Sequence, residues 1–265
     1  MNKKIGFIGS GNMAAAMIAG LIKKGINSSS IIASNPSREK LEKLNKLYNI
    51  NITDNNIETA DSDIIFLSVK PDKYPYVIDE IKNFIKNDTI VVSIAPSISL
   101  SFLQDKLGKN VKLVRAMPNT PALVGLGITA ICPNSLLNEE DIKFIEFIFS
   151  SFGEYEYIKE QLFPAVVGIA GSSPAYVYMF IEALADGGVY AGLPRDKALK
   201  MAASAVQGSA AMVLKTNEHP GLLKDKVCSP GGTTIEAVRE LEKNNFRYSV
   251  MEAVIKAYEK STKMS

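Results

Sequence analysis

Residues 5–14 read IGFIGSGNMA, a short apolar strand that passes through a glycine-rich turn directly into a helix-forming stretch. Gly9 allows a tight turn, Gly11 lets the backbone approach a pyrophosphate, and Ala14 lets the helix lie close to the strand. The start of such a helix directs free N–H groups and a partial positive charge toward the phosphates. Because residues 14–24 continue as one helical run, the context favours a dinucleotide-binding turn over an ordinary glycine turn.

The composition is that of a globular protein without a polyanionic partner. The 265 residues suffice for one large domain or two ordinary ones, and 46% hydrophobic residues can fill a sizeable core. The formal net charge is +2 with no basic run longer than a pair, so we expect no nucleic acid partner. Cys132 and Cys228 lie far apart without metal-ligand spacing, so no metal site is expected and a reducing compartment is favoured.

Two long uncharged stretches, 116–138 and 161–181, raise the question of a membrane span. A bilayer helix needs about 20 mostly apolar, unbroken residues. Prolines and glycines interrupt both stretches, Pro164 and Pro174 among them, so we expect buried or site-lining chain and no membrane partner. The N-terminus enters a strand at once, which leaves no room for a signal peptide, and the expected location is cytoplasmic.

Up to residue 160 the sequence alternates between apolar strands and amphipathic helices. The apolar run 64–69 is typical of a strand in a sheet that helices cover on both faces. The pattern predicts an α/β fold whose N-terminal domain, residues 1–160, is a Rossmann-type doubly wound sheet that binds the dinucleotide. Further strands are expected at 31–34, 49–53, 64–69, 89–94, 111–117, 127–132 and 154–158, with helices at 38–47, 74–86, 100–107 and from Asn138 to Gly153.

Beyond residue 160 the pattern predicts helices alone. The C-terminal domain, residues 161–265, is expected to be all-helical and to serve dimerisation. That it also binds substrate is implied by the family resemblance described below. Residues 202–211 carry almost no bulky side chain, so another helix can approach them closely. A subunit interface and an internal helix contact both fit this pattern. The expected helices are 174–190, 194–215, 232–244 and 246–262.

The turn after the second expected strand bears on the choice of nucleotide. NAD enzymes place an Asp or Glu about 20 residues beyond the glycine turn, where it accepts the ribose hydroxyls. This chain has no carboxylate there: Asn35 can bond the ribose, while Ser37 and Arg38 can bond a 2′-phosphate. NADPH is therefore favoured, with NADH as the alternative, although Arg38 could instead simply open a surface helix.

Seven later segments together carry a family resemblance. They are VKP at 69–71, MPNTP at 117–121, ALADGGV at 183–189, GLPR at 192–195, HPG at 219–221, LKD at 223–225 and SPGGTTI at 229–235. With them, the chain resembles the pyrroline-5-carboxylate reductases from residue 5 to about residue 258. The resemblance implies NADPH- or NADH-dependent reduction of 1-pyrroline-5-carboxylate to L-proline, the last step of proline biosynthesis, by interlocked homodimers that often assemble into decamers.

By this resemblance, two sets of residues would form the active site. The set expected to bind the cofactor is Gly9, Ser10, Gly11, Asn12, Met13, Asn35, Ser37, Arg38, Asn56, Val69, Lys70, Pro71 and Ala95. The set expected to bind substrate is Met117, Asn119, Thr120, Glu160, Gly231, Gly232, Thr233 and Thr234. Ser173 departs from the family pattern, which usually has glycine there; close backbone approach is then in question, while the serine could cap the following helix.

The turn at 231–234 offers a group to each end of the imine substrate. Its two glycines lead into a helix whose free N–H groups can hold the carboxylate, and the Thr234 hydroxyl can bond the ring nitrogen. From the residues alone, a simple helix start with a threonine cap fits the turn as well.

Candidate acids and bases are few. Hydride transfer to a protonated imine needs no strong acid, and the single histidine, His219, is expected to have a structural role in its turn. Lys70, at the sheet's ligand-binding edge, is the catalytic candidate besides Thr234, although a solvated lysine that orients a loop fits equally well. Lys70 would be the base of a 3-hydroxy-acid dehydrogenase, the alternative enzyme. The non-enzymatic alternative is a nucleotide-sensing scaffold that catalyses no reaction.

Overall fold

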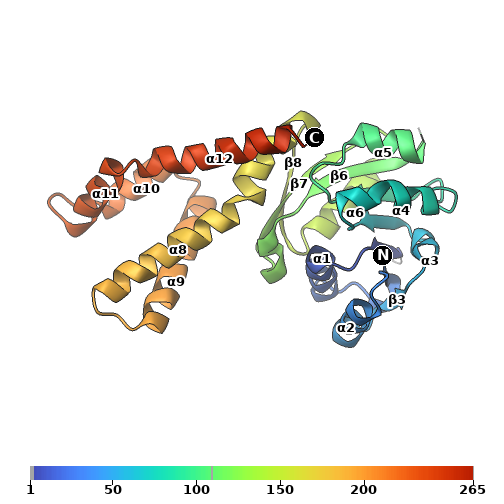
Figure 1. Ribbon diagram of the computed structural model, residues 1–265, viewed down its shortest axis with the longest axis horizontal. Helices are drawn as coiled ribbons and strands as arrows, with labels where there is room; N and C mark the ends of the chain where they lie inside the picture. Colours follow the sequence, from blue (N-terminus) through green and yellow to red (C-terminus); the bar gives the residue numbers. More distant parts are fainter. Residues whose placement is uncertain (1–2, 109, 265) are drawn as a thin grey trace. The chain divides into compact units, whose positions relative to one another are not determined.

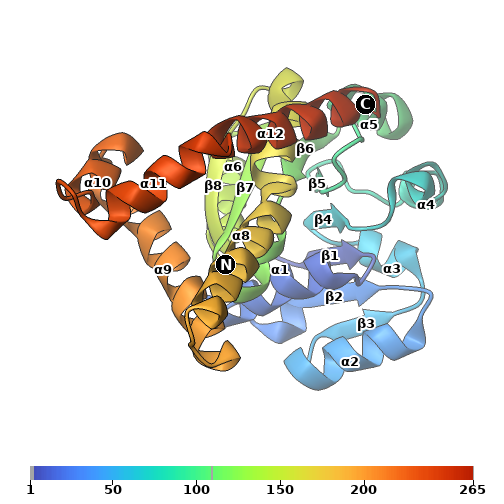
Figure 2. The same cartoon turned by 60° about the vertical axis from the view of Figure 1, so that its left-hand side comes forward.

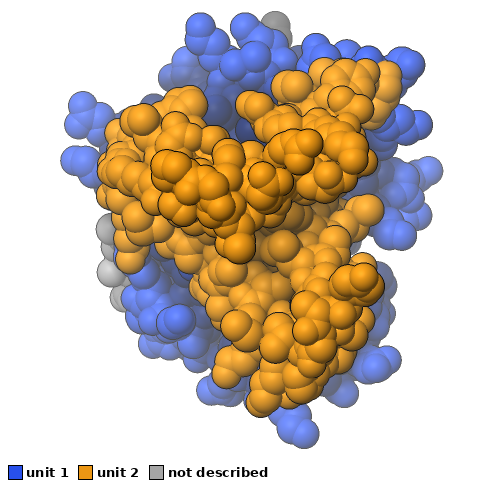
Figure 3. Space-filling model, turned by 90° about the vertical axis from the view of Figure 1, so that its left-hand side faces the viewer, with its two compact units in different colours: residues 1–171, 257–265 blue, residues 172–256 orange. Residues whose placement is uncertain are grey.

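The computed structural model describes residues 3–108 and 110–264 (Figure 1). These residues form two compact units. Unit 1 extends to Gly171 and includes the end of the C-terminal helix from Ala257 onward, and unit 2 comprises Ser172–Lys256. Figure 3 colours the two units separately. The domain boundary expected at residue 160 stays a prediction.

Unit 1 is built on one sheet, whose described strands lie in the order β3-β2-β1-β4-β5-β6-β7-β8 (Figure 2). All neighbouring strands are parallel except β6 and β7, which are antiparallel. The strand order reverses beside β1, and the ligand crevice of a doubly wound sheet lies at this reversal, beyond the carboxyl ends of the strands. The strands are β1 (Ile5–Ile8), β2 (Ile31–Ser34), β3 (Asn51–Thr53), β4 (Ile64–Leu67), β5 (Ile90–Ser93), β6 (Lys112–Met117), β7 (Gly127–Pro133) and β8 (Gly153–Tyr157).

Helices cover both faces of this sheet, which is why its central strands read as apolar runs. On one face, Phe7 and Phe66 stack with their ring centroids 4.9 Å apart, within a core that includes side chains of α1, α2 and α6. On the other face, Tyr74 and Leu103 bring α4 and α5 against the sheet. The helices of unit 1 that concern the site are α1 (Asn12–Lys23), α2 (Arg38–Tyr48), α3 (Asn56–Ala60), α4 (Tyr74–Ile81), α5 (Leu100–Leu107) and α6 (Glu139–Phe149).

Three local expectations in unit 1 are wrong. Helix α3 was not expected, because five residues are too few to show a helical period. Helix α4 ends at Ile81 instead of continuing to residue 86. Gly153 does not end α6 but opens β8: its φ is +152°, and a Cβ there would lie 2.0 Å from the carbonyl oxygen of Gly127 on the neighbouring strand.

Unit 2 consists of helices, as expected. Helices α8 and α9 pack through small side chains, with Ala185, Ala198 and Ala202 buried between them. Of the small-residue stretch 202–211, only Ala202 is buried, so the internal contact accounts for one end of that stretch. The helices are α8 (Ser173–Tyr190), α9 (Arg195–Thr216), α10 (Pro220–Val227), α11 (Thr233–Lys243) and α12 (Phe246–Thr262).

Two details of unit 2 differ from the sequence expectation. Helix α10 was not among the expected helices, and its N-cap is His219, whose Nδ1 accepts a hydrogen bond from the Gly221 N–H at 3.1 Å. This contact gives the histidine the structural role expected of it. At the start of α8, the N-cap position belongs to Ser172, and Ser173 is the first helical residue.

The prolines and glycines of the apolar stretch 161–181 interrupt it less than expected. The run Glu160–Tyr190 is a succession of helical segments with a bend at Ser172, and it is long and apolar enough, by length and composition only, to cross a membrane. Pro164 and Pro174 lie in the first turns of α7 (Phe163–Val166) and α8, where a missing N–H costs nothing. Between them, Val167–Gly171 forms one π-helical turn. The prolines therefore begin helical segments without breaking the run.

Candidate active site

Gly9 forms the tight turn that the sequence predicts between β1 and α1. Its φ is +97°, and its N–H donates to the Ser34 carbonyl at 2.9 Å. A Cβ at this position would lie 2.6 Å from the backbone oxygen of Ser68, which follows β4. The turn thus lies where the ends of three neighbouring strands meet, and only glycine fits it.

The start of α1 provides donors for a phosphate. Gly11 is the N-cap, and no side chain caps the helix. A Cβ at Gly11 would meet nothing within 4 Å, so the side on which a ligand would approach is open. Next to it, the Ser10 hydroxyl is buried without a hydrogen-bond partner in the described structure. Uncapped N–H groups, open space and an unpartnered hydroxyl fit a pyrophosphate.

A cavity of about 580 Å³ extends from Gly9 along the ends of β2 and β4. Asn56 is held in it through both ends of its amide: Oδ1 accepts from the Ser34 hydroxyl at 2.7 Å, and Nδ2 donates to Glu80 Oε2 at 2.8 Å. Glu80 and Asp54 also line the cavity, so carboxylates lie near the nucleotide region although none follows β2 directly. Sequence reasoning missed both, because they come from segments that only the fold brings beside β2.

The residues expected to meet a 2′-phosphate lie at the start of α2. Ser37 is its N-cap but makes no side-chain cap, and its N–H donates to Asn35 Oδ1 at 2.8 Å. Arg38 is exposed, with its Nε 3.0 Å from Glu42 Oε1. An exposed pair of this kind is weak, so the guanidinium remains able to turn toward an anion.

Val69, Lys70 and Pro71 follow β4 at the same edge of the sheet. Val69 lines the cavity, and Lys70 is exposed with no ion pair in the described residues. Pro71 begins a short 3₁₀ helix, Pro71–Lys73, whose last N–H donates to the Lys70 carbonyl at 2.9 Å. The lysine is therefore placed by its backbone, while its ammonium group is free to move.

Tyr74 fixes the ends of β4 and β5 relative to one another. Its hydroxyl donates to the Leu67 carbonyl at 2.6 Å and lies 3.0 Å from Ser93 Oγ, which accepts from the Ala95 N–H. Burial raises the pKa of Tyr74 well above its usual range, so the phenol stays neutral. Sequence reasoning missed this residue, which holds Ala95 in place. The only signal was a tyrosine at the start of the helix that follows the VKP segment.

The end of β6 carries the residues expected to meet substrate. Met117 and Asn119 are buried, and Thr120 is exposed. Both ends of the Asn119 amide are engaged, since Nδ2 donates to the Ala170 carbonyl at 3.1 Å and Oδ1 accepts from the Ile128 N–H at 3.0 Å. Asn119 thus ties β7 to the π-helical turn, and Thr120 has the freer side chain.

Glu160 has partners inside unit 1. Its Oε1 lies 3.0 Å from Arg115 Nη1 and accepts from the Leu100 N–H at 2.7 Å. Burial and the Glu160 charge together raise the pKa of the nearby Cys132 thiol, so the thiol stays protonated at neutral pH. Sequence reasoning missed Arg115, although a lone charged residue inside the apolar run 113–117 was a signal for it.

The turn at 231–234 lies in unit 2 and opens α11. Gly231 has φ +67°, and Gly232 is the N-cap, where a Cβ would lie 2.4 Å from Ser229 Oγ. No side chain caps α11, so its first N–H groups are available to an anion. Thr233 and Thr234 lie within the helix, which excludes the threonine cap that the residues alone allowed. The Thr234 hydroxyl has no hydrogen-bond partner in the part of the chain that is described.

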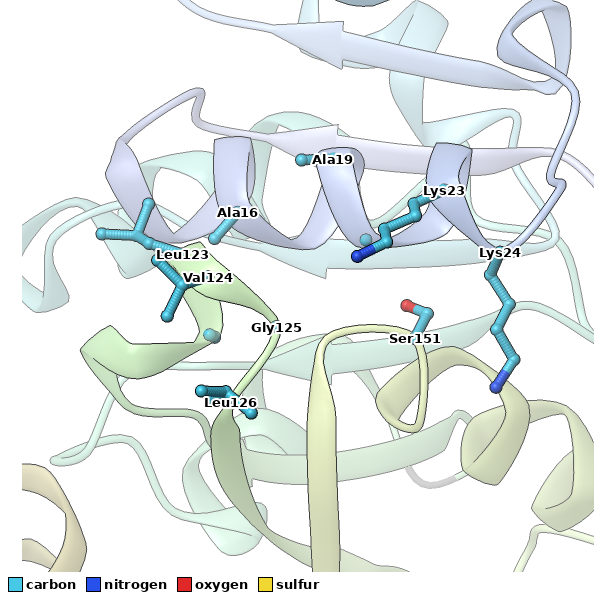
Figure 4. A pocket seen from close by; sticks show the side chains of 11 residues that line it. Ala16, Ala19, Lys23, Lys24, Leu123, Val124, Gly125, Leu126 and Ser151 are labelled. Atoms are coloured by element: carbon cyan, nitrogen blue, oxygen red, sulfur yellow. The ribbon is translucent and has the colours of Figure 1, made fainter. Parts of the chain in front are cut away.

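The structure thus brings most expected residues of unit 1 to one edge of the sheet, while the 231–234 turn belongs to unit 2. A second hollow, of about 560 Å³, contains none of them (Figure 4). It lies between the end of α1, with Lys23 and the C-cap residue Lys24, and the segment Leu123–Leu126, and we do not assign it to the active site. Among the described residues, no group of three or more His, Cys, Asp or Glu could hold a metal ion.

Comparisons with known proteins match a nucleotide-binding region and a helical region in this chain. Residues 160–264 match the family model described as pyrroline-5-carboxylate reductase dimerisation, and residues 4–97 match one described as NADP oxidoreductase coenzyme F420-dependent. The pyrroline-5-carboxylate reductase of Escherichia coli strain K12 is 52% identical over 267 residues, which cover 100% of this chain and 99% of that protein.

Two solved structures share the fold over nearly their whole length. The pyrroline-5-carboxylate reductase of Coxiella burnetii has a TM-score of 0.93 at 31% identity, covering 100% of this chain and 99% of that one. The pyrroline carboxylate reductase of Plasmodium falciparum, solved with NADP bound, has a TM-score of 0.89 at 37% identity, covering 99% and 98%. The α/β class with a following helical domain is confirmed. Because the similarity extends over its whole length, this chain belongs to the pyrroline-5-carboxylate reductase family.

Proposed function

We propose that this protein reduces 1-pyrroline-5-carboxylate to L-proline with NADPH or NADH, the last step of proline biosynthesis. The observation that carries the proposal is the 52% identity, over the full chain, to a reductase of that name. The structure supports it with two uncapped helix starts led by glycine, one for a pyrophosphate in unit 1 and one for a carboxylate in unit 2.

A reduced nicotinamide, when bound, supplies the hydride that the imine carbon receives. In unit 1, the N–H groups at the start of α1 and the Ser10 hydroxyl hold the pyrophosphate. Asn35 and Asn56 hold the adenosine end. The remaining cofactor contacts assigned to the chain are Gly9, Gly11, Asn12, Met13, Ser37, Arg38, Val69, Lys70, Pro71 and Ala95.

On the substrate side, the first N–H groups of α11 bind the carboxylate, because Gly231 and Gly232 leave the backbone uncovered. Thr234 Oγ1 accepts a hydrogen bond from the protonated ring nitrogen. No strong acid is needed, because the iminium charge disappears as the carbon is reduced. Met117, Asn119, Thr120 and Thr233 complete the assigned contacts.

The decisive test of the function is consumption of NADPH in the presence of 1-pyrroline-5-carboxylate, with proline identified as the product. We expect turnover by the wild type, and Lys70→Ala is expected to lose less than about threefold in kcat/KM, since reduction of an already protonated imine needs no acid from Lys70. Oxidation of a 3-hydroxy acid that depends on Lys70 would instead identify a dehydrogenase. Absence of any turnover with NADPH or NADH would support a non-catalytic scaffold.

The NADPH preference is expected to depend on the start of α2. Arg38→Ala and Ser37→Ala should each raise the KM for NADPH by about tenfold and leave the KM for NADH nearly unchanged, because a charge-assisted hydrogen bond to the 2′-phosphate is lost. Lys43→Ala, an exposed change on the same helix, is the control and should alter neither value. Equal effects of Arg38→Ala on both cofactors would show that Arg38 only opens a surface helix.

The chain forms a homo-oligomer through its helical region, which matches a dimerisation model. The exposed apolar surface of the run Glu160–Tyr190 lies within the matched residues, so we assign it to contact between subunits and not to a membrane. A homodimer that assembles further into a decamer is our proposal for the complete particle, and the cytoplasm is the compartment we propose for it.

A further inference from the structure

Arg115 is a buried cation in the middle of a sheet. It lies on β6 in register with Cys132 of the antiparallel β7, and its side chain is only 6% exposed. Placing a guanidinium among apolar side chains is unfavourable unless its hydrogen bonds are satisfied. The chain therefore has to supply hydrogen-bond partners for the guanidinium, and these partners show which segments Arg115 connects.

The partners come from two segments outside the strand. Nη2 donates to the Pro96 carbonyl at 2.5 Å, and Nη1 donates to Glu160 Oε1 at 3.0 Å, while the buried Nε has no hydrogen-bond partner among the described residues. The guanidinium also lies over the ring of Phe163, 4.5 Å from its centroid. One side chain thus joins β6 to the loop after β5 and to the segment that begins at Glu160.

Glu160 completes the connection. The same Oε1 that faces Arg115 accepts the N–H of Leu100, the first residue of α5, at 2.7 Å. The loop between β5 and α5 is therefore held at two points, at Pro96 by the guanidinium and at Leu100 by the carboxylate. Ala95, which we assign to the nicotinamide side, is the residue next to Pro96.

We propose that Arg115 and Glu160 form a positioning pair that fixes the loop 95–100 for the nicotinamide end of the cofactor. In this role Glu160 acts through Arg115 and Leu100. The family resemblance implied instead that Glu160 binds the substrate directly. The inference rests on the proposed function, because it assumes that Ala95 faces a nicotinamide. The geometry favours it because Glu160 Oε1 already accepts hydrogen bonds from two donors inside unit 1.

The chain offers a matched control on the same strand. Lys112, at the opposite end of β6, pairs with Asp141 of α6 at 2.9 Å, and the two side chains are 15% and 6% exposed. Arg115→Met and Lys112→Met each remove one cation from a buried pair, so both should lower resistance to urea. Only Arg115 lies beside the ligand-binding edge of the sheet. A loss shared by both variants therefore reports general destabilisation, and a loss confined to Arg115→Met reports positioning.

The first measurement is binding, by titration calorimetry. Arg115→Met should weaken NADPH binding about fivefold to tenfold and leave adenosine 2′,5′-bisphosphate, which lacks the nicotinamide, within about twofold of wild type. Lys112→Met should leave both ligands within about twofold. Equal weakening of both ligands by Arg115→Met would overturn the proposal, because the whole site would then be affected.

The second measurement is kinetic. Arg115→Met should lower kcat about 10- to 50-fold, less than the 10²-fold typical of a 1 Å displacement, and should increase the isotope effect with NADPH deuterated at the transferred position. Arg115→Lys, which can reach one of the two partners, should recover part of the loss. The inference would be overturned if the wild type turns over and Arg115→Met loses no more kcat than Lys112→Met does. Absence of wild-type turnover would instead refute the proposed function.

Glu160→Gln separates positioning from direct binding of substrate. The amide oxygen can still accept from Leu100 and Arg115, so the KM for 1-pyrroline-5-carboxylate should stay within about threefold of wild type. A rise of about tenfold or more in that KM with an unchanged kcat would identify Glu160 as a substrate ligand and overturn the proposal. If Arg115→Met does not fold, Arg115→Lys decides the question by the same binding and kinetic comparisons.

Discussion

Gly9→Ala is expected to lower NADPH-dependent turnover by more than about 10²-fold and to reduce the free energy of unfolding by about 2–4 kcal/mol. Two effects combine at this position. An alanine at φ +97° is strained, and its methyl carbon would lie 2.6 Å from the rigid backbone oxygen of Ser68. Relief requires the turn to move away from the end of β4, which displaces the start of α1 from the phosphates.

Gly25→Ala is the matched control at the other end of α1. Gly25 also has a left-handed φ, +94°, but a Cβ there would meet nothing within 4 Å. We expect it to cost about 1–2 kcal/mol of unfolding free energy through backbone strain alone, with NADPH binding unchanged. Urea unfolding and calorimetric titration with NADPH measure the two quantities separately. Intact NADPH binding by folded Gly9→Ala would show that the turn does not set the cofactor position.

Thr234→Ala is expected to lower kcat/KM for 1-pyrroline-5-carboxylate by roughly 10²- to 10³-fold, the range found when one preorganised hydrogen-bonding group is removed from an active site. The hydroxyl has no partner among the described side chains, so the substrate would be its partner. Alanine has the higher helix propensity, so the second residue of α11 should stay folded. Initial rates of NADPH consumption give the result.

Thr234→Ser keeps the hydroxyl and is the control. It should retain activity within about tenfold of wild type, because serine places the same oxygen with more rotational freedom. If Thr234→Ala reduces the imine as fast as the wild type, the ring nitrogen is bound by another group. Equal losses in Thr234→Ala and Thr234→Ser would point to the threonine methyl group as the feature that matters.

Local signals explain what could be predicted from the sequence. The turn at Gly9 was predictable because strand, glycines and helix are contiguous, and the structure shows the collision that requires glycine. The strand at 64–69 was predictable because burial on both faces leaves an uninterrupted apolar run. At 231–234, two consecutive glycines before a helix indicated exposed N–H groups, and α11 begins there without a cap.

Residues that act through distant partners could not be predicted in this way. Tyr74 reads as an ordinary aromatic residue until β4 and β5 place Leu67 and Ser93 on either side of its hydroxyl. Glu160 was expected to be a substrate ligand, and its contacts with Arg115 and Leu100 span 45 and 60 positions of the chain. Hydrogen bonds over such separations leave no periodic trace in the sequence.

The three buried alanines of unit 2 have a consequence for how the protein comes into being. A cluster made of Ala185, Ala198 and Ala202 provides little hydrophobic free energy, while α8 alone exposes Tyr178, Met179 and Leu184 to water. We therefore expect folding of this region to be coupled to subunit pairing, as in obligate dimers. Newly made chains would mature by second-order kinetics, and dilution would lower the melting temperature.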